Sequence, residues 1–284
     1  MRFTKMQGAG NDFIVINNIV EKIPQERLPE LANRLCTRRL SIGADGMMVV
    51  EEAQDGGDYR MLFYNSDGSL GEMCGNGARC IARYGYEKGL AGDVQKVETT
   101  AGLVVGKRVD SRMYTVRLND ITHFEQDLVL DASGLSVRCD YLELGNPGLP
   151  HIVVRLDDAN ELTEENLREL GKELRWHKTL PKGANVNFCS LTGENEVKEL
   201  TYERGVEDFT LACGTGTGSV VASLATKGLV SGKNTKVSVP GGTLYITLGF
   251  DGDTQKITDI DLTGPTNIVA EGDVCDEDID GILI

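Results

Sequence analysis

The chain carries one motif twice, as Met73-Cys74-Gly75-Asn76-Gly77 and as Ala212-Cys213-Gly214-Thr215-Gly216. Each copy continues into an apolar stretch that closes with Lys-Gly-Leu, and the Cys precedes the closing Gly by 15 residues in both copies. A Gly that follows such a stretch is typical of a helix C-terminus. The motif therefore predicts two helices, each opened by a Gly-rich turn at a Cys.

The start of a helix is a favourable place for negative charge. Its first backbone N–H groups have no acceptor within the helix, and the helix dipole is positive there. Such an end binds anions and stabilises the thiolate of a Cys in the first turn, which brings the thiol pKa near working pH. We expect Cys74 and Cys213 to be reactive for this reason. The simpler interpretation of a Cys, a small buried hydrophobe, is kept for four cysteines without this context: Cys36, Cys80, Cys139 and Cys189.

Composition limits the classes of protein to consider. A chain of 284 residues with 40% hydrophobic content has room for one large core or two smaller ones. The net charge of −15, without a basic block, disfavours nucleic acid and anionic membranes as partners. We see no signal peptide or membrane-spanning run and expect a reducing, cytoplasmic location. Scattered histidines and the lack of a Cys-x-x-Cys pair predict that there is no metal site.

The motif belongs to a longer internal repeat. A Gly loop and an apolar strand begin at residues 8–16 and again at 145–154, and helical spacing of Leu follows at 28–36 and 163–174. The start of a strand comes next in each half, where Gly43-Ala44-Asp45-Gly46 matches Gly183-Ala184-Asn185-Val186. After the motif helix each half has a hairpin with a central Gly. The order predicts two similar α+β halves, with a ligand in the cleft between them.

Two cysteines at two helix starts suit one kind of chemistry. One thiolate removes the weakly acidic proton from a carbon, while a thiol on the opposite face delivers another. Backbone N–H groups of both helix starts would stabilise the adjacent carboxylate as it gains charge. This is a two-base racemisation or epimerisation at the α-carbon of an amino acid, and it needs no cofactor.

The chain resembles diaminopimelate epimerases along its whole length. The stretches that carry the resemblance are Gly8–Phe13, Tyr64–Gly68, Glu72–Cys80, Gly145–Pro147, Asn185–Val186, Tyr202–Val206 and Leu211–Gly216. The resemblance implies two pseudo-symmetric domains, each a mixed sheet curled around a central helix, with the active site in the cleft between them. We expect residues 1–112 plus 267–284 to form one domain and residues 113–266 the second.

The resemblance also implies roles for individual residues. Cys74 and Cys213 would alternate as base and acid, and no cofactor would be required. His151 and Glu203 are candidates for catalytic support. The implied substrate contacts are Asn11, Asn65, Gly75, Asn76, Asn146, Asn185, Glu203, Arg204, Gly214 and Thr215. In this set Arg204 would bind a second carboxylate and Glu203 an ammonium group, although a turn or cap is the commoner role for any single Asn.

The sequence departs from the family pattern in two loops. The usual Gly-Asn-Pro-His is three residues longer here, as Gly145–His151, and the segment between Arg204 and Cys213 is one residue longer. Both loops border the substrate in the family. We therefore keep two alternatives to epimerisation of LL-diaminopimelate, a reaction of lysine and peptidoglycan biosynthesis. They are a two-cysteine racemase for another amino acid such as histidine, and a non-catalytic protein that binds an amino acid. A homodimer is the expected assembly.

Overall fold

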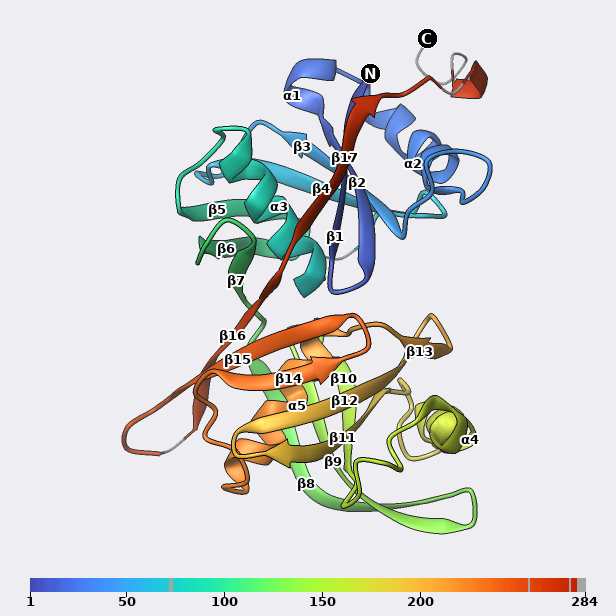
Figure 1. The fold of residues 1–284 in the computed structure, drawn as a ribbon, viewed down its shortest axis with the longest axis vertical. Helices are drawn as coiled ribbons and strands as arrows, with labels where there is room; N and C mark the ends of the chain where they lie inside the picture. The colour runs from blue at the N-terminus through green and yellow to red at the C-terminus, as the bar shows by residue number, and fades with distance from the viewer. Residues whose placement is uncertain (72–73, 255, 276, 280–284) are drawn as a thin grey trace. The chain divides into compact units, whose positions relative to one another are not determined.

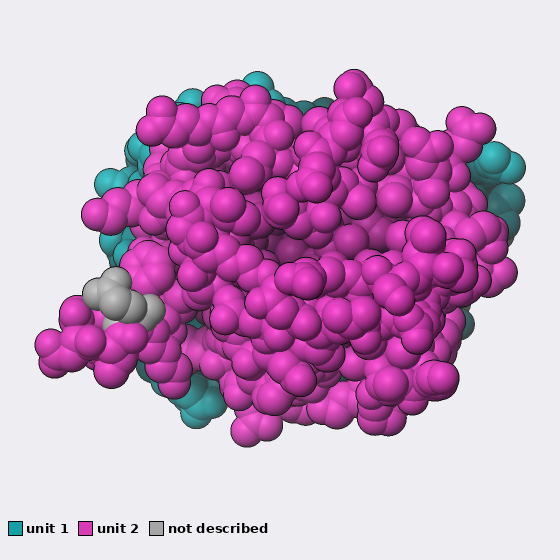
Figure 2. All heavy atoms as spheres, turned by 90° about the horizontal axis from the view of Figure 1, so that it is seen from below, with its two compact units in different colours: residues 1–116, 264–284 teal, residues 117–263 magenta. Residues whose placement is uncertain are grey.

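The computed structural model describes residues 1–71, 74–254, 256–275 and 277–279, so Met73 of the first motif and the preceding Glu72 lie outside it. The chain divides into two compact units, and Figure 2 colours their atoms separately. Unit 1 comprises Met1–Val116 with Gly264–Ile284, and unit 2 comprises Arg117–Thr263. The divisions thus follow residues 116 and 263, where the sequence suggested 112 and 266. No helix in the described ranges is long and apolar enough to cross a membrane.

Unit 1 combines a mixed sheet with α-helices (Figure 1). Its strands are β1 (Arg2–Gly8), β2 (Asn11–Asn17), β3 (Gly46–Glu51), β4 (Tyr59–Asn65), β5 (Val94–Thr99), β6 (Gly102–Arg108), β7 (Met113–Arg117) and β17 (Asn267–Asp273). Its α-helices are α1 (Asn18–Glu21), α2 (Leu28–Cys36) and α3 (Gly75–Glu87). Short 3-10 turns occur at Gln25–Arg27 and Glu277–Ile279.

Unit 2 also combines a mixed sheet with α-helices. Its strands are β8 (Ile121–Ala132), β9 (Leu135–Leu144), β10 (Leu149–Arg155), β11 (Asn185–Gly193), β12 (Glu196–Glu203), β13 (Asp208–Thr210), β14 (Thr235–Val239), β15 (Gly242–Phe250) and β16 (Ile257–Pro265). Its helices are α4 (Glu164–Arg175) and α5 (Gly214–Thr226). Helices α3 and α5 begin directly after Cys74 and Cys213, as the duplicated motif predicts.

The pairing of the strands shows the internal repeat. In unit 1 the strands pair in the order β17-β1-β2-β3-β4-β5-β6-β7, and only β2–β3 and β4–β5 are parallel. In unit 2 the order is β8-β9-β10-β11-β12-β14-β15-β16, and the parallel pairs, β10–β11 and β12–β14, fall at the same two places. The parallel connections are made through α2 and α3 in one unit and through α4 and α5 in the other. The α+β fold built from two repeats is therefore confirmed.

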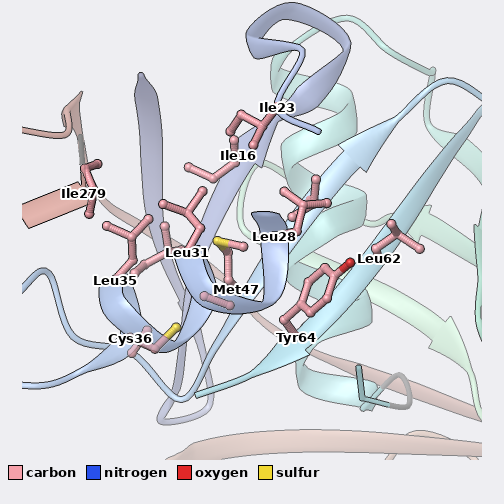
Figure 3. Packing of buried hydrophobic residues seen from close by; sticks show 14 residues of the cluster. Ile16, Ile23, Leu28, Leu31, Leu35, Cys36, Met47, Leu62, Tyr64 and Ile279 are labelled. Atoms are coloured by element: carbon pink, nitrogen blue, oxygen red, sulfur yellow. The ribbon is translucent and has the colours of Figure 1, made fainter. Parts of the chain in front are cut away.

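The two faces of the unit 1 sheet hold two separate apolar clusters because side chains alternate along a strand. On one face, Ile14 and Ile16 of β2 and Met47 and Val49 of β3 pack with α2, in the cluster drawn in Figure 3. On the opposite face, side chains from the alternate positions of the strands pack against Ile81 of α3. These side chains are Phe13, Val15, Met48, Val50 and Met61. The motif helix is thus a core element, and its N-terminus carries Cys74.

Unit 2 differs on the face that packs against its motif helix. The α4 face is apolar and includes Ile152, Phe188 and Leu200. The side chains between them, which lie toward α5, are largely polar yet buried: His151, Asn187, Glu199, Thr201 and, from α5 itself, Thr217. The two units therefore share a strand order, but the layer beneath the motif helix is apolar in unit 1 and largely polar in unit 2.

Candidate active site

Cys74 is the N-cap of α3, one position before the helix and not in its first turn as the sequence suggested. Its sulfur accepts a hydrogen bond from the backbone N–H of Gly77 at 3.3 Å, so the thiol takes the place that a Ser or Asp usually has at a cap. A Cβ at Gly77 would come within 2.8 Å of Met48 and 3.3 Å of this sulfur. Glycine at this position lets the strand, the sulfur and the helix start approach each other.

Arg79, one turn further along α3, places a buried positive charge at this helix start. Its side chain is fully buried, and its guanidinium donates to Oδ1 of Asn76 (2.8 Å) and to the carbonyl of Gly75 (3.3 Å). Burial lowers the pKa of Arg79 to about 10, while the nearby sulfurs of Cys80 and Cys74 oppose that shift. The attraction is mutual, so Arg79 favours negative charge on Cys74.

Two of the predicted Asn residues meet at the same helix start. Nδ2 of Asn76 donates to Oδ1 of Asn11, the first residue of β2, and Nδ2 of Asn11 donates to Asp45 at 3.2 Å. Asn65, the last residue of β4, is instead held within its own turn, where its side chain donates to Ser69 at 2.9 Å. In unit 1 the structure therefore brings Asn11 and Asn76 together beside Cys74.

Cys213 is the N-cap of α5 and is only 8% exposed. Its sulfur lies 3.6 Å from Oγ1 of Thr215. Burial, and next the charge of Glu203, raise the pKa of the Cys213 thiol well above its ordinary value. The hydroxyl of Thr215 and the N–H of Gly216 oppose this shift but do not overcome it. The expectation that the helix end alone would bring this pKa near working pH is thus wrong, because loss of water outweighs the helix start.

The ends of three strands in unit 2 bring together four more of the predicted residues. His151 on β10 pairs in register with Asn185 on β11, and Oδ1 of Asn185 accepts from the backbone N–H of Arg204 at 2.8 Å. Nη1 of Arg204 donates to the Lys182 carbonyl at 3.3 Å, and its side chain is otherwise exposed. Oε2 of Glu203 accepts from Oγ1 of Thr210 at 2.6 Å. Thr210 thus orients Glu203, a contact that nothing in the sequence indicated.

His151 is fully buried, and burial, with the charge of Arg204, lowers its pKa to about 3. The imidazole is therefore neutral over the physiological range. Its Nδ1 lies 3.3 Å from Nδ2 of Asn187, an amide donor, which assigns the ring proton to Nε2. That nitrogen has no hydrogen-bond partner among the described residues.

The two loops that are longer than in the family pattern differ in their contacts. The segment before Cys213 contains β13, and Glu207, directly before this strand, accepts from Arg175 of α4 at 2.8 Å and from Trp176 at 3.1 Å. This extra length is therefore held against α4. The turn before β10 instead leaves Asn146 exposed. Judged by strand register, Leu149 occupies the place in unit 2 that Asn11 has in unit 1.

The four cysteines expected to be small buried hydrophobes are buried, whereas Cys275 is exposed. Burial raises the pKa of Cys36, Cys80 and Cys139 to about 12 each, and that of Cys189 beyond this. Their thiols therefore stay protonated and unreactive. No cluster of three or more His, Cys, Asp or Glu side chains that could hold a metal occurs in the described ranges.

Comparison with known proteins gives the family. The family model described as diaminopimelate epimerase matches residues 3–118 and 144–268. A diaminopimelate epimerase of Aquifex aeolicus is 36% identical over 98% of this chain and 99% of its own length. One of Methanothermobacter thermautotrophicus is 35% identical over 88% of this chain and 91% of its own.

Solved structures show how widely the fold is shared. A probable proline racemase from Agrobacterium radiobacter matches 99% of this chain and 95% of its own, with a TM-score of 0.68 and 16% identity. A hydroxyproline epimerase from Agrobacterium vitis matches 96% and 90%, with a TM-score of 0.64 and 19% identity. At these identities the likeness concerns the fold alone. The family model and the curated relatives span both repeats, and on that evidence the chain belongs to the diaminopimelate epimerase family.

Proposed function

We propose that this protein is an isomerase that inverts the α-carbon of diaminopimelate, from the LL to the meso isomer, without a cofactor. The observation that carries the proposal is the pair of Cys N-caps. Each unit has a Cys directly before a helix, and the first N–H groups of each helix point toward its own Cys. Membership of the diaminopimelate epimerase family supports the choice of substrate.

In the proposed reaction one sulfur takes the α-proton and the second sulfur supplies a proton to the opposite face. Buried Arg79 favours negative charge on Cys74, and burial favours the neutral thiol of Cys213. We therefore assign Cys74 as the thiolate base and Cys213 as the thiol acid of the resting protein. In the reverse direction the two roles exchange, as microscopic reversibility requires.

The substrate carboxylate gains negative charge as the α-proton leaves. The backbone N–H groups of Gly75, Asn76, Gly214 and Thr215, at the two helix starts, are proposed to stabilise it. Arg204 is proposed to bind the distal carboxylate and Glu203 the distal ammonium group, with Asn185 fixing the backbone of Arg204. Asn11, Asn65, Asn146 and His151 remain proposed contacts or support. A cytoplasmic location and a homodimer likewise remain predictions.

An inversion assay over a panel of amino acids tests the choice of substrate. LL-Diaminopimelate, meso-diaminopimelate and single L-amino acids, histidine among them, would be incubated with the protein and separated by chiral chromatography. We expect inversion of diaminopimelate to exceed that of every monocarboxylate by at least about tenfold in kcat/KM, because only diaminopimelate engages Arg204. Faster inversion of histidine would overturn the substrate but keep the two-cysteine reaction. Tight binding of an amino acid without inversion would indicate a binding protein.

A further inference from the structure

We propose that Glu199 is a positioning residue for Cys213: held as a neutral carboxylic acid beneath the start of α5, it fixes the Cys213 carbonyl through Thr217 and keeps negative charge away from the thiol. This inference rests on the proposed role of Cys213 as an acid–base group. It concerns a side chain to which neither the sequence motifs nor the similarity to known proteins gives a role.

Comparison of the two repeats identifies Glu199 as unusual. Strand register pairs Val50 with Met61 in unit 1 and Cys189 with Glu199 in unit 2. The motif helices align the strands of the two units. A Cβ at Gly77 would contact Met48, and a Cβ at the equivalent Gly216 would contact Asn187, so Met48 and Asn187 are equivalent positions. Glu199 therefore occupies the place of Met61, a residue of the apolar cluster under α3.

The residues around Glu199 also stand at positions that are apolar in unit 1. By the same register, Thr201 takes the place of Phe63 and Asn187 that of Met48. On the helix, Thr217 takes the place of Ala78, since each lies four residues after its Cys. Unit 1 thus builds this layer from apolar side chains, so the fold does not require a carboxyl group here. A buried carboxyl costs stability unless it is neutral or well bonded, which points to a role in function.

The hydrogen bonds of Glu199 and its burial together indicate its protonation state. Oγ1 of Thr217 lies 2.7 Å from Oε2 of Glu199 and 3.1 Å from the Cys213 carbonyl, yet it has one hydrogen. Oγ1 of Thr201 lies 3.0 Å from Oδ1 of Asn187 and 3.3 Å from Oε1 of Glu199, also with one hydrogen. Each hydroxyl hydrogen is therefore shared, and Thr217 bridges Glu199 to the Cys213 carbonyl, which also accepts from the backbone N–H of Thr217 at 2.9 Å. A carboxyl group that is 1% exposed and has no ion-pair partner among the described residues is stable there as the neutral acid.

Surrounding charges agree with a neutral Glu199. Helix α5 contains no ionisable side chain, and no described ion pair involves Glu199, which is 1% exposed. The titratable groups nearest to it are Cys189 of β11, His151 of β10 and Cys213, and the pKa shifts of all three favour the neutral form. Glu203 of β12 faces Cys213 as well, and its charge also raises the pKa of that thiol. Lys236 of β14 is paired with Glu196 instead. Burial raises the pKa of Glu199 to about 7, and the hydroxyls of Thr217 and Thr201 partly oppose the shift.

The two protonation states have different effects on the thiol. Neutral Glu199 leaves the helix start free of added charge. Ionised Glu199 raises the pKa of Cys213 further, because its charge repels a thiolate. The reactivity of Cys213 should therefore rise less steeply with pH than that of a thiol without such a neighbour.

Alkylation by iodoacetamide tests this without substrate, with each Cys followed by peptide mass spectrometry. Glu199→Gln keeps an amide donor and acceptor but cannot ionise. At about pH 6, below the shifted pKa of the Glu199 carboxyl, wild type and Glu199→Gln should alkylate at Cys213 equally fast. At about pH 8.5 the variant should react roughly threefold to tenfold faster, the effect of one nearby charge. Cys74 should react alike in both proteins at both pH values.

Thr217→Val provides a second variant, should Glu199→Gln fold poorly. It removes the best donor to an ionised Glu199, so Glu199 should remain neutral to higher pH and Cys213 should react faster than wild type at about pH 8.5. A rate ratio between variant and wild type that is independent of pH, or equal rates at both pH values, would overturn the proposal. If the pH-dependent ratio is found in a protein that inverts no amino acid, only the proposed function fails.

Discussion

Cys74→Ala and Cys213→Ala are each expected to lower kcat/KM for inversion of diaminopimelate by roughly 10²–10⁴-fold, the usual contribution of a general acid or base. Each face of the α-carbon needs its own proton-transfer group, so one remaining thiol cannot complete the inversion. The measurement is the initial rate in both directions, from the LL and from the meso isomer. Both directions should fall together because the equilibrium constant is fixed.

Two matched controls separate loss of chemistry from loss of packing. Cys36→Ala in unit 1 and Cys139→Ala in unit 2 remove buried thiols that have no part in the proposed reaction. They should lower the free energy of unfolding by about 1–2 kcal/mol while leaving kcat/KM within about twofold of wild type. Near-normal inversion by either motif variant would contradict the two-base proposal.

Arg204→Lys is expected to lower kcat/KM for diaminopimelate by more than about tenfold. Lys keeps the positive charge but loses the planar fork that binds a carboxylate through two parallel hydrogen bonds. Leaving a charged partner unpaired costs roughly 2–5 kcal/mol. The guanidinium of Arg204 is exposed, and its described hydrogen bond goes to the Lys182 carbonyl. The substitution should therefore weaken substrate binding and leave the free energy of unfolding nearly unchanged.

Arg155→Lys, at the far end of β10 and paired with Asp157, is the matched control and should leave kcat/KM nearly unchanged. The effect of Arg204→Lys should also be small for any monocarboxylate that the protein accepts. An equal loss for both substrate classes would show that Arg204 acts on the site as a whole and not on a second carboxylate.

Most of the fold could be predicted because the motif is local and duplicated. The Gly-rich turn after each Cys and the Gly 15 residues later define α3 and α5 by their own backbone chemistry. Repetition then extends the assignment to the sheets. The repeat alignment of the two strand starts is wrong, however, because it makes Gly46 equivalent to Val186. Register shows that Gly46 corresponds to Asn185, and a slip of one residue moves every side chain to the opposite face.

That slip explains why the polar layer under α5 could not be predicted. In the wrong register Asn187 matches Met47 of the α2 face, and nothing marks it as a neighbour of Cys213. Glu199 looks like a charged residue of an alternating strand, whose usual place is the surface. The high pKa of Cys213 was missed for the same reason, since burial depends on packing that no local pattern contains.

The origin of the proton in the product tests the central claim most directly. Turnover of LL-diaminopimelate would be started in deuterated water, and substrate and product would be separated at low conversion for mass spectrometry. With Cys74 removing one proton and Cys213 delivering another, the meso product should carry one deuterium at the inverted carbon while recovered substrate carries almost none. Recovered substrate labelled as fully as product, or product that keeps the original hydrogen, would mean that a single group transfers the proton and would contradict the account.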